Sequence, residues 1–320
     1  MLHQGSGAAW PPPAATAAAG VASGAMRPGP RAPSVSVVTV TGRPGSIDVT
    51  WGALRAQSFP DFEWVLCDGL FTWRAPEVAA FVDDGRLRHV AAPAAGEGLW
   101  SLNRSYNEAL RHCRGELVVS LQDYIWVEPD GIERFWSAHR RHGGRAFVTG
   151  ITATYALPAP VEAPDGKVTI FAEPWTGPPT ERLRVDESRH RFPPGLSPTT
   201  AFGWELNWAA APLAGLLDVG GFAEDHDRNF YSCDNVTVAV VADRLGYRFL
   251  VDRDNACRAL DHGAVFPRPR DWEERHGRRG AWDRWYRDWV ARGCPPLGDL
   301  RGGGRGASAA PSARRRGPPS

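Results

Sequence analysis

Three aspartates and a histidine supply most of the chemistry that this sequence could support. Asp68 closes the apolar run FEWVLCDG, Asp123 closes GELVVSLQD, and Asp234 stands at the start of the stretch CDNVTVAVVADRLG. His262 lies in ALDHG, after the apolar run YRFLVD. A carboxylate can bind a hard cation or accept a proton from a hydroxyl group, and an imidazole can join carboxylates around Mn²⁺.

The elements that position these residues alternate along the first half of the chain. Short apolar runs predict buried strands, and helical spacing of apolar residues predicts helices between them. The predicted strands are Ser34–Val40, Phe62–Gly69, Leu87–Ala92 and Gly115–Asp123. The predicted helices are Ser46–Gln57, Pro76–Val82, Ser101–Cys113 and Asp130–His142. This alternation implies βαβ units and an α/β fold with a mostly parallel sheet.

Ligands of such a sheet bind beyond the carboxyl ends of its strands. Asp68 and Asp123 both follow strand ends, so two carboxylates from separate strands should face one crevice. Each also has a structural alternative, because Asp68 can form a turn before Gly69 and Asp123 can cap the turn that follows it.

The second half is less regular. It predicts strands at Ala146–Leu157, Lys167–Glu173 and Tyr247–Asp252 and a helix over Cys233–Gly246. Residues 174–200 are polar and rich in Pro, which is typical of a mobile loop over a site. Trp282, Trp285 and Trp289 recur at helical spacing, and we expect this stripe to pack on the main domain. The interleaved arginines leave open a surface for single-stranded nucleic acid.

The bulk composition excludes several classes of protein. The 320 residues are 42% hydrophobic and 23% charged with a net charge of +1, as in soluble globular proteins that carry no field favouring nucleic acid. The five cysteines are odd in number and form no CxxC, which argues against a disulfide framework or structural zinc. No apolar run reaches the roughly 18 residues of a membrane span. We therefore expect a cytoplasmic protein, with the inner face of the membrane as a peripheral alternative.

The two ends of the chain differ in composition from the region between them. Residues 1–33 and 301–320 are Gly, Pro, Ala, Ser and Arg tracts, which we predict to be disordered. The region between them, 34–300, is predicted to be the folded domain. Met26, just before the first predicted strand, is an alternative start of translation.

Four segments carry a resemblance to a known family: VSVVTVTGRP, FPDFEWVLCDG, SYNEALRHCRGELVVSLQD and LLDVGGFAEDHDRNFYSCDNVTVAVVADRLGYRF. In this order and spacing, they resemble the family-2 glycosyltransferases of GT-A fold over residues 34–265. The resemblance implies a nucleotide-sugar-binding half at 34–145 and an irregular acceptor-side half at 146–300. It also implies a UDP- or GDP-sugar donor, Mn²⁺ or Mg²⁺ as cofactor, and an inverting transfer to a hydroxyl group. The acceptor could be a glycan, a lipid-linked saccharide, a protein or a small molecule.

The resemblance assigns roles to the residues named at the outset. Gln122-Asp123-Tyr124 corresponds to the family's Asp-x-Asp motif with its outer acids lost. Asp123 is expected to hold the cation together with His262, and Asp234 is expected to be the catalytic base. Tyr124 departs from the motif, because a phenol is a poor ligand for Mg²⁺ at neutral pH.

Further residues are carried over in the same way. The donor-binding set is Thr41, Asp68, Arg104, Asn107, Gln122 and Asp123, and the acceptor-binding set is Trp204, Glu205 and Asp225. Two cysteines mark departures, since Cys67 replaces the acid that usually precedes Asp68 and Cys233 replaces the Glu that usually precedes the base.

Structural explanations stay open for many of these residues. Asp234 can simply stabilise a helix N-terminus, and His262 can be structural or exposed. Arg104 and Asn107 can be solvated residues of a helix face, and Trp204 can belong to the core. At the level of function, the alternative is a catalytically weak or inactive GT-A-shaped module that binds a glycan or nucleotide. A nicotinamide-dependent dehydrogenase is disfavoured, because TGRPG replaces the GxGxxG turn after the first strand.

Overall fold

The computed structural model describes residues 31–42, 47–82, 84–94, 101–156, 161–162, 168–169, 182–185, 191–229, 234–260 and 278–301. The chain divides into two units, residues 1–31 and residues 32–320, and every element below belongs to the second.

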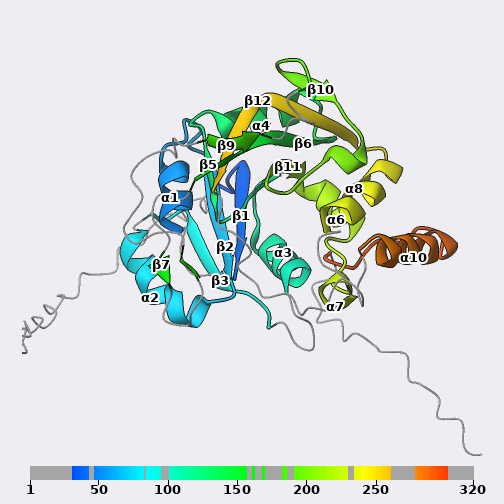
Figure 1. Cartoon of the computed structure of the whole chain (residues 1–320), viewed down its shortest axis with the longest axis horizontal. Helices are drawn as coiled ribbons and strands as arrows, with labels where there is room; N and C mark the ends of the chain where they lie inside the picture. The colour runs from blue at the N-terminus through cyan, green and yellow to red at the C-terminus, as the bar shows by residue number, and fades with distance from the viewer. Residues whose placement is uncertain are drawn as a thin grey trace, which may run out of the picture. The chain divides into compact units, whose positions relative to one another are not determined.

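Four parallel strands form one half of the main sheet in the order β3-β2-β1-β4 (Figure 1). They are β1 (Val35–Thr41), β2 (Phe62–Asp68), β3 (Leu87–Ala91) and β4 (Leu117–Leu121). Every residue of β2 and β4 is buried, because both faces of the sheet are covered. The four predicted strands are therefore confirmed, with ends that differ by one or two residues.

Helices cover both faces of this half (Figure 1). They are α1 (Ile47–Arg55), α2 (Phe71–Phe81), α3 (Leu102–His112) and α4 (Gly131–Arg141). The prediction for α2 was wrong at its start, since Pro76 lies inside the helix instead of opening it. The proline removes a single backbone donor, and the carbonyl that loses its partner belongs to the exposed Thr72, where water can replace the bond.

A second set of strands extends the sheet on the other side of β4. The order β4-β11-β6-β12-β10 contains β6 (Ala146–Tyr155), β10 (Leu196–Pro198), β11 (Trp208–Pro212) and β12 (Arg248–Leu260). β11 runs antiparallel to both β4 and β6, while β6 and β12 are parallel to each other. The result is a curled, mostly parallel α/β sheet flanked by helices, as the sequence predicts.

Two predictions for the second half need correction. The strand expected to stop at Asp252 continues to Leu260, because a register shift between Val251 and Ala256 lets it bend and go on pairing with β6. Within the segment expected to be a loop, β9 (Arg182–Val185) pairs with β6 and β10 pairs with β12, while 174–181 and 186–190 lie outside the described residues.

A strand is also predicted from Lys167 to Glu173. It is described over β8 (Val168–Thr169), which pairs with β7 (Val161–Glu162), and the remainder lies outside the described residues.

The remaining helices belong to the second half of the chain. They are η1 (Ala201–Gly203), α6 (Leu213–Val219), α7 (His226–Asn229), α8 (Asp234–Arg244) and α10 (Arg278–Ala291). The tryptophan stripe of α10 packs as predicted, with Trp289 buried and Trp282 and Trp285 partly buried against the main core. No helix in the described part of the chain is long and apolar enough to cross a bilayer.

Two apolar cores lie on the two faces of the sheet. Successive residues of a strand point to opposite faces, so Val37 enters the core under α1, α2 and α4, while Val38 enters the core under α3, α6 and α8. The last residues of β1 and β2, Thr41 and Asp68, are polar and belong to neither core.

Candidate active site

Three of the predicted polar residues meet at the carboxyl edge of the sheet. Thr41 ends β1 and stands directly opposite Asp68, the last residue of β2. The Thr41 hydroxyl also donates a 2.6 Å hydrogen bond to Asp123 Oδ2, two residues beyond the end of β4. All three residues are buried. The strand order therefore places Asp68 and Asp123 at the same edge of the sheet, at the ends of the two strands that flank β1.

The Asp68 carboxylate is enclosed by protein groups. Its Oδ1 accepts the backbone N–H of Leu70 at 2.8 Å, which is the geometry of a turn aspartate. Its Oδ2 lies 3.0 Å from His89 Nε2 and 3.6 Å from Arg74 Nε, and the carboxylate side chain has no exposed surface. Asp68 therefore forms the turn that the sequence left open as its structural role. A ligand at this edge would contact the residues around Asp68 and not its carboxylate directly.

Cys67 cannot supply the charge of the acid that it replaces. Its side chain points into the core under α3, on the opposite face from Asp68. Burial raises the pKa of the thiol to about 12, so it carries no charge at neutral pH.

The two neighbours of Asp123 in the motif have different surroundings. The Gln122 amide oxygen Oε1 is buried and has no hydrogen-bond donor among the described residues. The ring of Tyr124, by contrast, packs against the core under α1. The two neighbours of Asp123 are therefore not equivalent, and Gln122 is the one that offers a second oxygen atom.

The end of β12 lies beside the same motif. β5 (Ile125–Val127) pairs with β12, and Leu260 donates its backbone N–H to the Tyr124 carbonyl at 2.9 Å. Leu260 precedes His262 by two residues in the sequence. His262 itself lies outside the described residues, but the strand leading to it ends next to Asp123.

The start of α8 is tied to this edge by a short chain of contacts. α8 begins at Asp234, whose side chain lies outside the described part, and Asn235 donates its amide N–H to the Trp204 carbonyl at 2.7 Å. Three residues further on, the Asn207 carbonyl accepts the backbone N–H of Gln122 at 3.2 Å. The segment 204–207 thus joins the N-terminus of α8 to the motif around Asp123.

The predicted donor-binding residues of α3 are engaged in holding a neighbouring loop. The Asn107 amide donates to the Phe222 carbonyl and to Glu224, and its oxygen accepts the Phe222 N–H. Arg104 is partly buried, and its backbone N–H and guanidinium Nε both approach the carboxylate of Asp227.

Asp227 is a residue that sequence reasoning missed. Its buried carboxylate also accepts the backbone N–H of Asn103, so it caps the first turn of α3 from α7. The signal in the sequence was weak, because the residue lies more than a hundred positions from the helix that it caps.

The predicted acceptor-side residues are placed differently from one another. The Trp204 indole is 1% exposed and packs edge-on against Phe147 in the core, so it presents no surface to an acceptor. Its identification as an acceptor-binding residue is therefore corrected to the core role that the sequence left open. Glu205 is partly buried and Asp225 is exposed. The neighbouring Phe202, which sequence reasoning missed, is 62% exposed.

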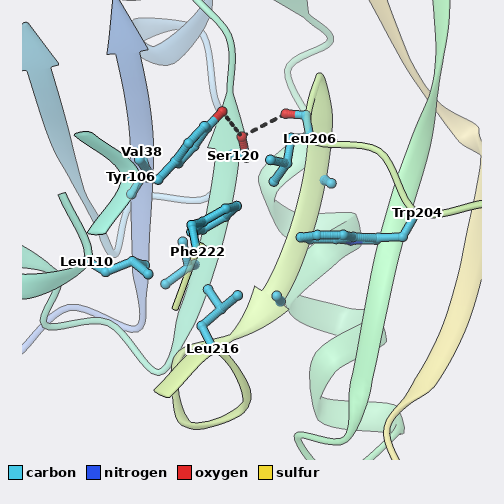
Figure 2. A pocket seen from close by; sticks show the side chains of 11 residues that line it. Val38, Tyr106, Leu110, Ser120, Trp204, Leu206, Leu216 and Phe222 are labelled. Atoms are coloured by element: carbon cyan, nitrogen blue, oxygen red, sulfur yellow. Dashed lines mark hydrogen bonds between the residues drawn. The ribbon is translucent and has the colours of Figure 1, made fainter. Parts of the chain in front are cut away.

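A small cavity lies in the core behind this edge (Figure 2). The Ser120 hydroxyl donates to the Leu206 carbonyl at 2.7 Å and lies 3.3 Å from the Tyr106 hydroxyl, so these polar groups bond to each other. The rest of the lining is apolar, and the volume of about 10 Å³ is the room that a single water molecule needs. The cavity is a gap in packing and cannot hold a nucleotide.

The oxygen atoms at the edge suit a hard cation. The Asp123 carboxylate and the orphaned Gln122 amide oxygen are the ligand types that Mg²⁺ and Mn²⁺ prefer. Among the described residues, no three His, Cys, Asp or Glu side chains are grouped so that they could hold a metal ion. A complete coordination shell for a metal ion would therefore need a ligand from outside the described residues, such as His262.

The sheet order, the inserted antiparallel β11 and the polar carboxyl edge define a GT-A-like fold. No protein-family model matches the chain, and no curated protein matches it in sequence. Among solved structures, the mannosyltransferase PcManGT from Pyrobaculum calidifontis in complex with GDP-Man and Mn²⁺ matches with a TM-score of 0.50 at 19% identity. The match covers 81% of this chain and 66% of that one. At this identity the match establishes the fold and does not extend to the reaction.

Two structures of TarS from S. aureus also match over 71% of this chain at 16% identity. The structure of residues 1–349 in complex with UDP has a TM-score of 0.45 and is covered over 60% of its length. The other has a TM-score of 0.44 and is covered over 36%. The chain thus spans less than two thirds of the length of each of these three solved chains.

Proposed function

We propose that this chain is an inverting glycosyltransferase of the family-2 type, which transfers a sugar from a UDP- or GDP-sugar to an acceptor hydroxyl with Mn²⁺ or Mg²⁺. The observation that carries the proposal is the meeting of Thr41, Asp123 and the end of β12 at the carboxyl edge of a GT-A-like sheet. In such sheets this edge is where ligands bind.

The donor side is built from groups that protein contacts already hold in place. The Thr41 hydroxyl orients the Asp123 carboxylate, and both are held in buried positions. Asp123, the Gln122 amide oxygen and His262 would hold the cation. When bound, a divalent cation offsets the negative charge of a diphosphate leaving group. Asp68 acts indirectly in this scheme, by orienting His89 and Arg74 at the end of β2.

The acceptor side supplies the base. The acceptor oxygen forms a bond to the anomeric carbon as the bond from that carbon to the diphosphate oxygen breaks. The proton of the acceptor hydroxyl passes to the Asp234 carboxylate, and the nucleoside diphosphate leaves. Asn235 fixes the first turn of α8 to the Trp204 carbonyl, which keeps the helix that carries Asp234 in place.

Specific observations also favour the second candidate, a module of the same fold that binds a nucleotide or glycan without turnover. The Asp68 carboxylate is enclosed by Leu70, His89 and Arg74, and the ring of Tyr124 packs against the core. In the family that the chain resembles, acidic residues at both positions contact the donor or its cation.

Calorimetry and nucleotide release separate the two. Purified protein would be titrated with UDP- and GDP-sugars with and without Mn²⁺, and release of UDP or GDP would be followed in the same samples. We expect metal-dependent binding with slow hydrolysis of one donor. Binding without hydrolysis would favour the module. Absence of donor binding would overturn the glycosyltransferase and the nucleotide-binding form of the module, and would leave only a glycan-binding module.

Two variants assign the roles. Asp234→Asn should abolish turnover and leave donor binding within about twofold, whereas Asp123→Asn should weaken metal-dependent binding itself. Asp243→Asn is a matched control, because it makes the same change on an exposed side chain at the other end of α8. Retained turnover in Asp234→Asn would remove Asp234 from the role of base.

A further inference from the structure

One exposed aromatic ring stands next to the helix that carries the proposed base. In the described part of the chain, the exposed large hydrophobic side chains are Trp73, Phe202, Leu245 and Val290, and Phe202 is the most exposed at 62%. Scattered apolar side chains on a surface are ordinary, so exposure by itself does not mark a site. The position of Phe202 is what distinguishes it.

Phe202 belongs to η1, a short turn that packs on α8. Two residues after Phe202, the Trp204 carbonyl accepts the side-chain N–H of Asn235, the residue that follows Asp234. The turn itself is tight, because a Cβ on Gly203 would lie 2.3 Å from the Thr199 hydroxyl. The ring is therefore presented from a constrained turn beside the N-terminus of α8.

The C-terminal helix supports the ring from one side. Trp282 makes an edge-to-face contact with Phe202 at 6.0 Å and 65°, and it stacks in turn on Tyr286 at 5.0 Å. An edge-to-face pair covers at most one face of the phenyl ring.

α10 is itself firmly attached. Trp289 is buried and donates its indole N–H to the Pro295 carbonyl at 2.7 Å, and the Arg244 guanidinium of α8 lies over its ring. The support under Phe202 is thus fixed to the same helix that begins at Asp234.

We propose that Phe202, supported by Trp282, is a contact surface for the C–H face of a pyranose ring, and hence that the acceptor is a saccharide. This inference rests on the proposed function for the place of the reaction. One face of a pyranose is lined by C–H groups, which gain by covering an aromatic face, while the hydroxyl groups at its rim stay in water.

The size of the surface favours this occupant over a protein partner. A stable protein interface buries about 800 Å² on each side, far more than one phenyl ring with a partly buried indole behind it can supply. A single sugar ring, in contrast, matches a single phenyl ring in area. The sequence pointed to Trp204 as the aromatic residue of the acceptor side, and the structure moves that role to Phe202.

The experiment measures binding of trisaccharides without donor, by saturation-transfer NMR, to the full-length protein. The probes are maltotriose, cellotriose, mannotriose and the chitin trisaccharide. Phe202→Ala and Phe202→Leu remove the aromatic face, and Phe202→Tyr keeps it. Leu245→Ala is the matched control, since it removes another exposed apolar side chain, directly after the opposite end of α8. Thermal unfolding verifies that every variant is folded.

We expect at least one trisaccharide to bind the wild type, Phe202→Tyr and Leu245→Ala equally, and to lose about tenfold in affinity in Phe202→Ala and Phe202→Leu. The inference is overturned if none of the probes binds, or if removing the ring leaves affinity unchanged. It is also overturned if the wild type self-associates in sedimentation and Phe202→Ala abolishes this, because a second copy would then be the occupant. Donor hydrolysis in the same preparations tests the proposed function separately, so either result can fail without the other.

Discussion

The Thr41 hydroxyl donates a 2.6 Å hydrogen bond to Asp123 Oδ2, joining the ends of two parallel strands across 82 positions in the sequence. Both residues are buried, so the carboxylate depends on protein groups for its orientation. Thr41, predicted to bind the donor, and Asp123, predicted to bind the cation, are therefore in direct contact.

Thr41→Val should therefore impair the site while Thr41→Ser preserves it. Valine matches threonine in shape but withdraws the donor, and the loss of a hydrogen bond to a charged group costs about 1.5–3 kcal/mol. We expect weaker Mn²⁺-dependent donor binding by calorimetry and a lower free energy of unfolding in urea. If Thr41→Val bound donor as the wild type does, the hydroxyl would have no role in presenting Asp123.

Asp68→Asn tests the enclosed carboxylate at the end of β2. The substitution removes the negative charge that faces His89 and Arg74, and removing one member of a buried ion pair costs about 3–5 kcal/mol. Glu108→Gln is the control, because Glu108 pairs with Arg111 at the surface and should lose less than about 1 kcal/mol. Equal losses in urea unfolding would contradict a structural role for Asp68.

The buried imidazole of His226 should make the free energy of unfolding depend on pH. Burial lowers the pKa of its imidazole from 6.5 to about 4 in the folded protein. The unfolded chain therefore binds more protons than the folded one between these values, and stability falls as pH drops through this window. The contribution of this histidine is complete above pH 6.5 and amounts to roughly 3 kcal/mol there.

The measurement compares urea unfolding of wild type and His226→Gln between pH 7 and pH 4. The stability difference between the two should shrink or reverse toward pH 4, since glutamine has no proton to take up. Parallel profiles for wild type and His226→Gln would show that the buried imidazole does not control this dependence.

Substitutions at Gly220 and Gly293 distinguish the cost of a left-handed backbone from the cost of a steric clash. Both adopt left-handed backbone, with φ of 87° and 80°. A Cβ on Gly220 would lie 2.3 Å from the Gly298 carbonyl oxygen, whereas nothing lies within 4 Å of one on Gly293. Gly293→Ala should cost about 1 kcal/mol, and Gly220→Ala about 3 kcal/mol or more because it also pushes the C-terminal segment away.

Leu297 gives that segment its attachment, since it donates a backbone hydrogen bond to the Val219 carbonyl at 2.8 Å. Hydrogen exchange at Leu297 should accordingly increase in Gly220→Ala and stay unchanged in Gly293→Ala. If both variants lost the same stability and protection, the close approach of Gly220 and Gly298 would not matter.

Local patterns in the sequence predicted the first half of the fold well. The runs that contain Val37 and Leu66 are apolar on both faces, and a run of this kind forms a strand wherever helices can cover it. The same patterns fail for α2, where they predict a helix start at Pro76, and for β12, where a register shift lets the strand continue past Asp252. Both errors concern where a helix or strand begins or ends. These limits depend on packing partners that are distant in the sequence.

The site was predictable in its place and less so in its contacts. Asp68 and Asp123 follow apolar runs, so their position at the carboxyl edge follows from strand order. The engagement of Asp68 by His89 and Arg74 depends on how β3 and α2 pack beside β2, and no spacing in the sequence encodes that packing.

The sequence by itself determined the alternation of strands and helices, and with it the edge where polar residues gather. The reason is that a strand covered on both faces is apolar along most of its length, and this run is visible in the sequence. Only the tertiary structure decided which neighbour is buried and which is exposed at that edge. Trp204 and Phe202 are both large aromatic residues two positions apart, and one fills the core while the other faces water. Their exposure is set by α8, α10 and Phe147, which reach them from distant parts of the chain.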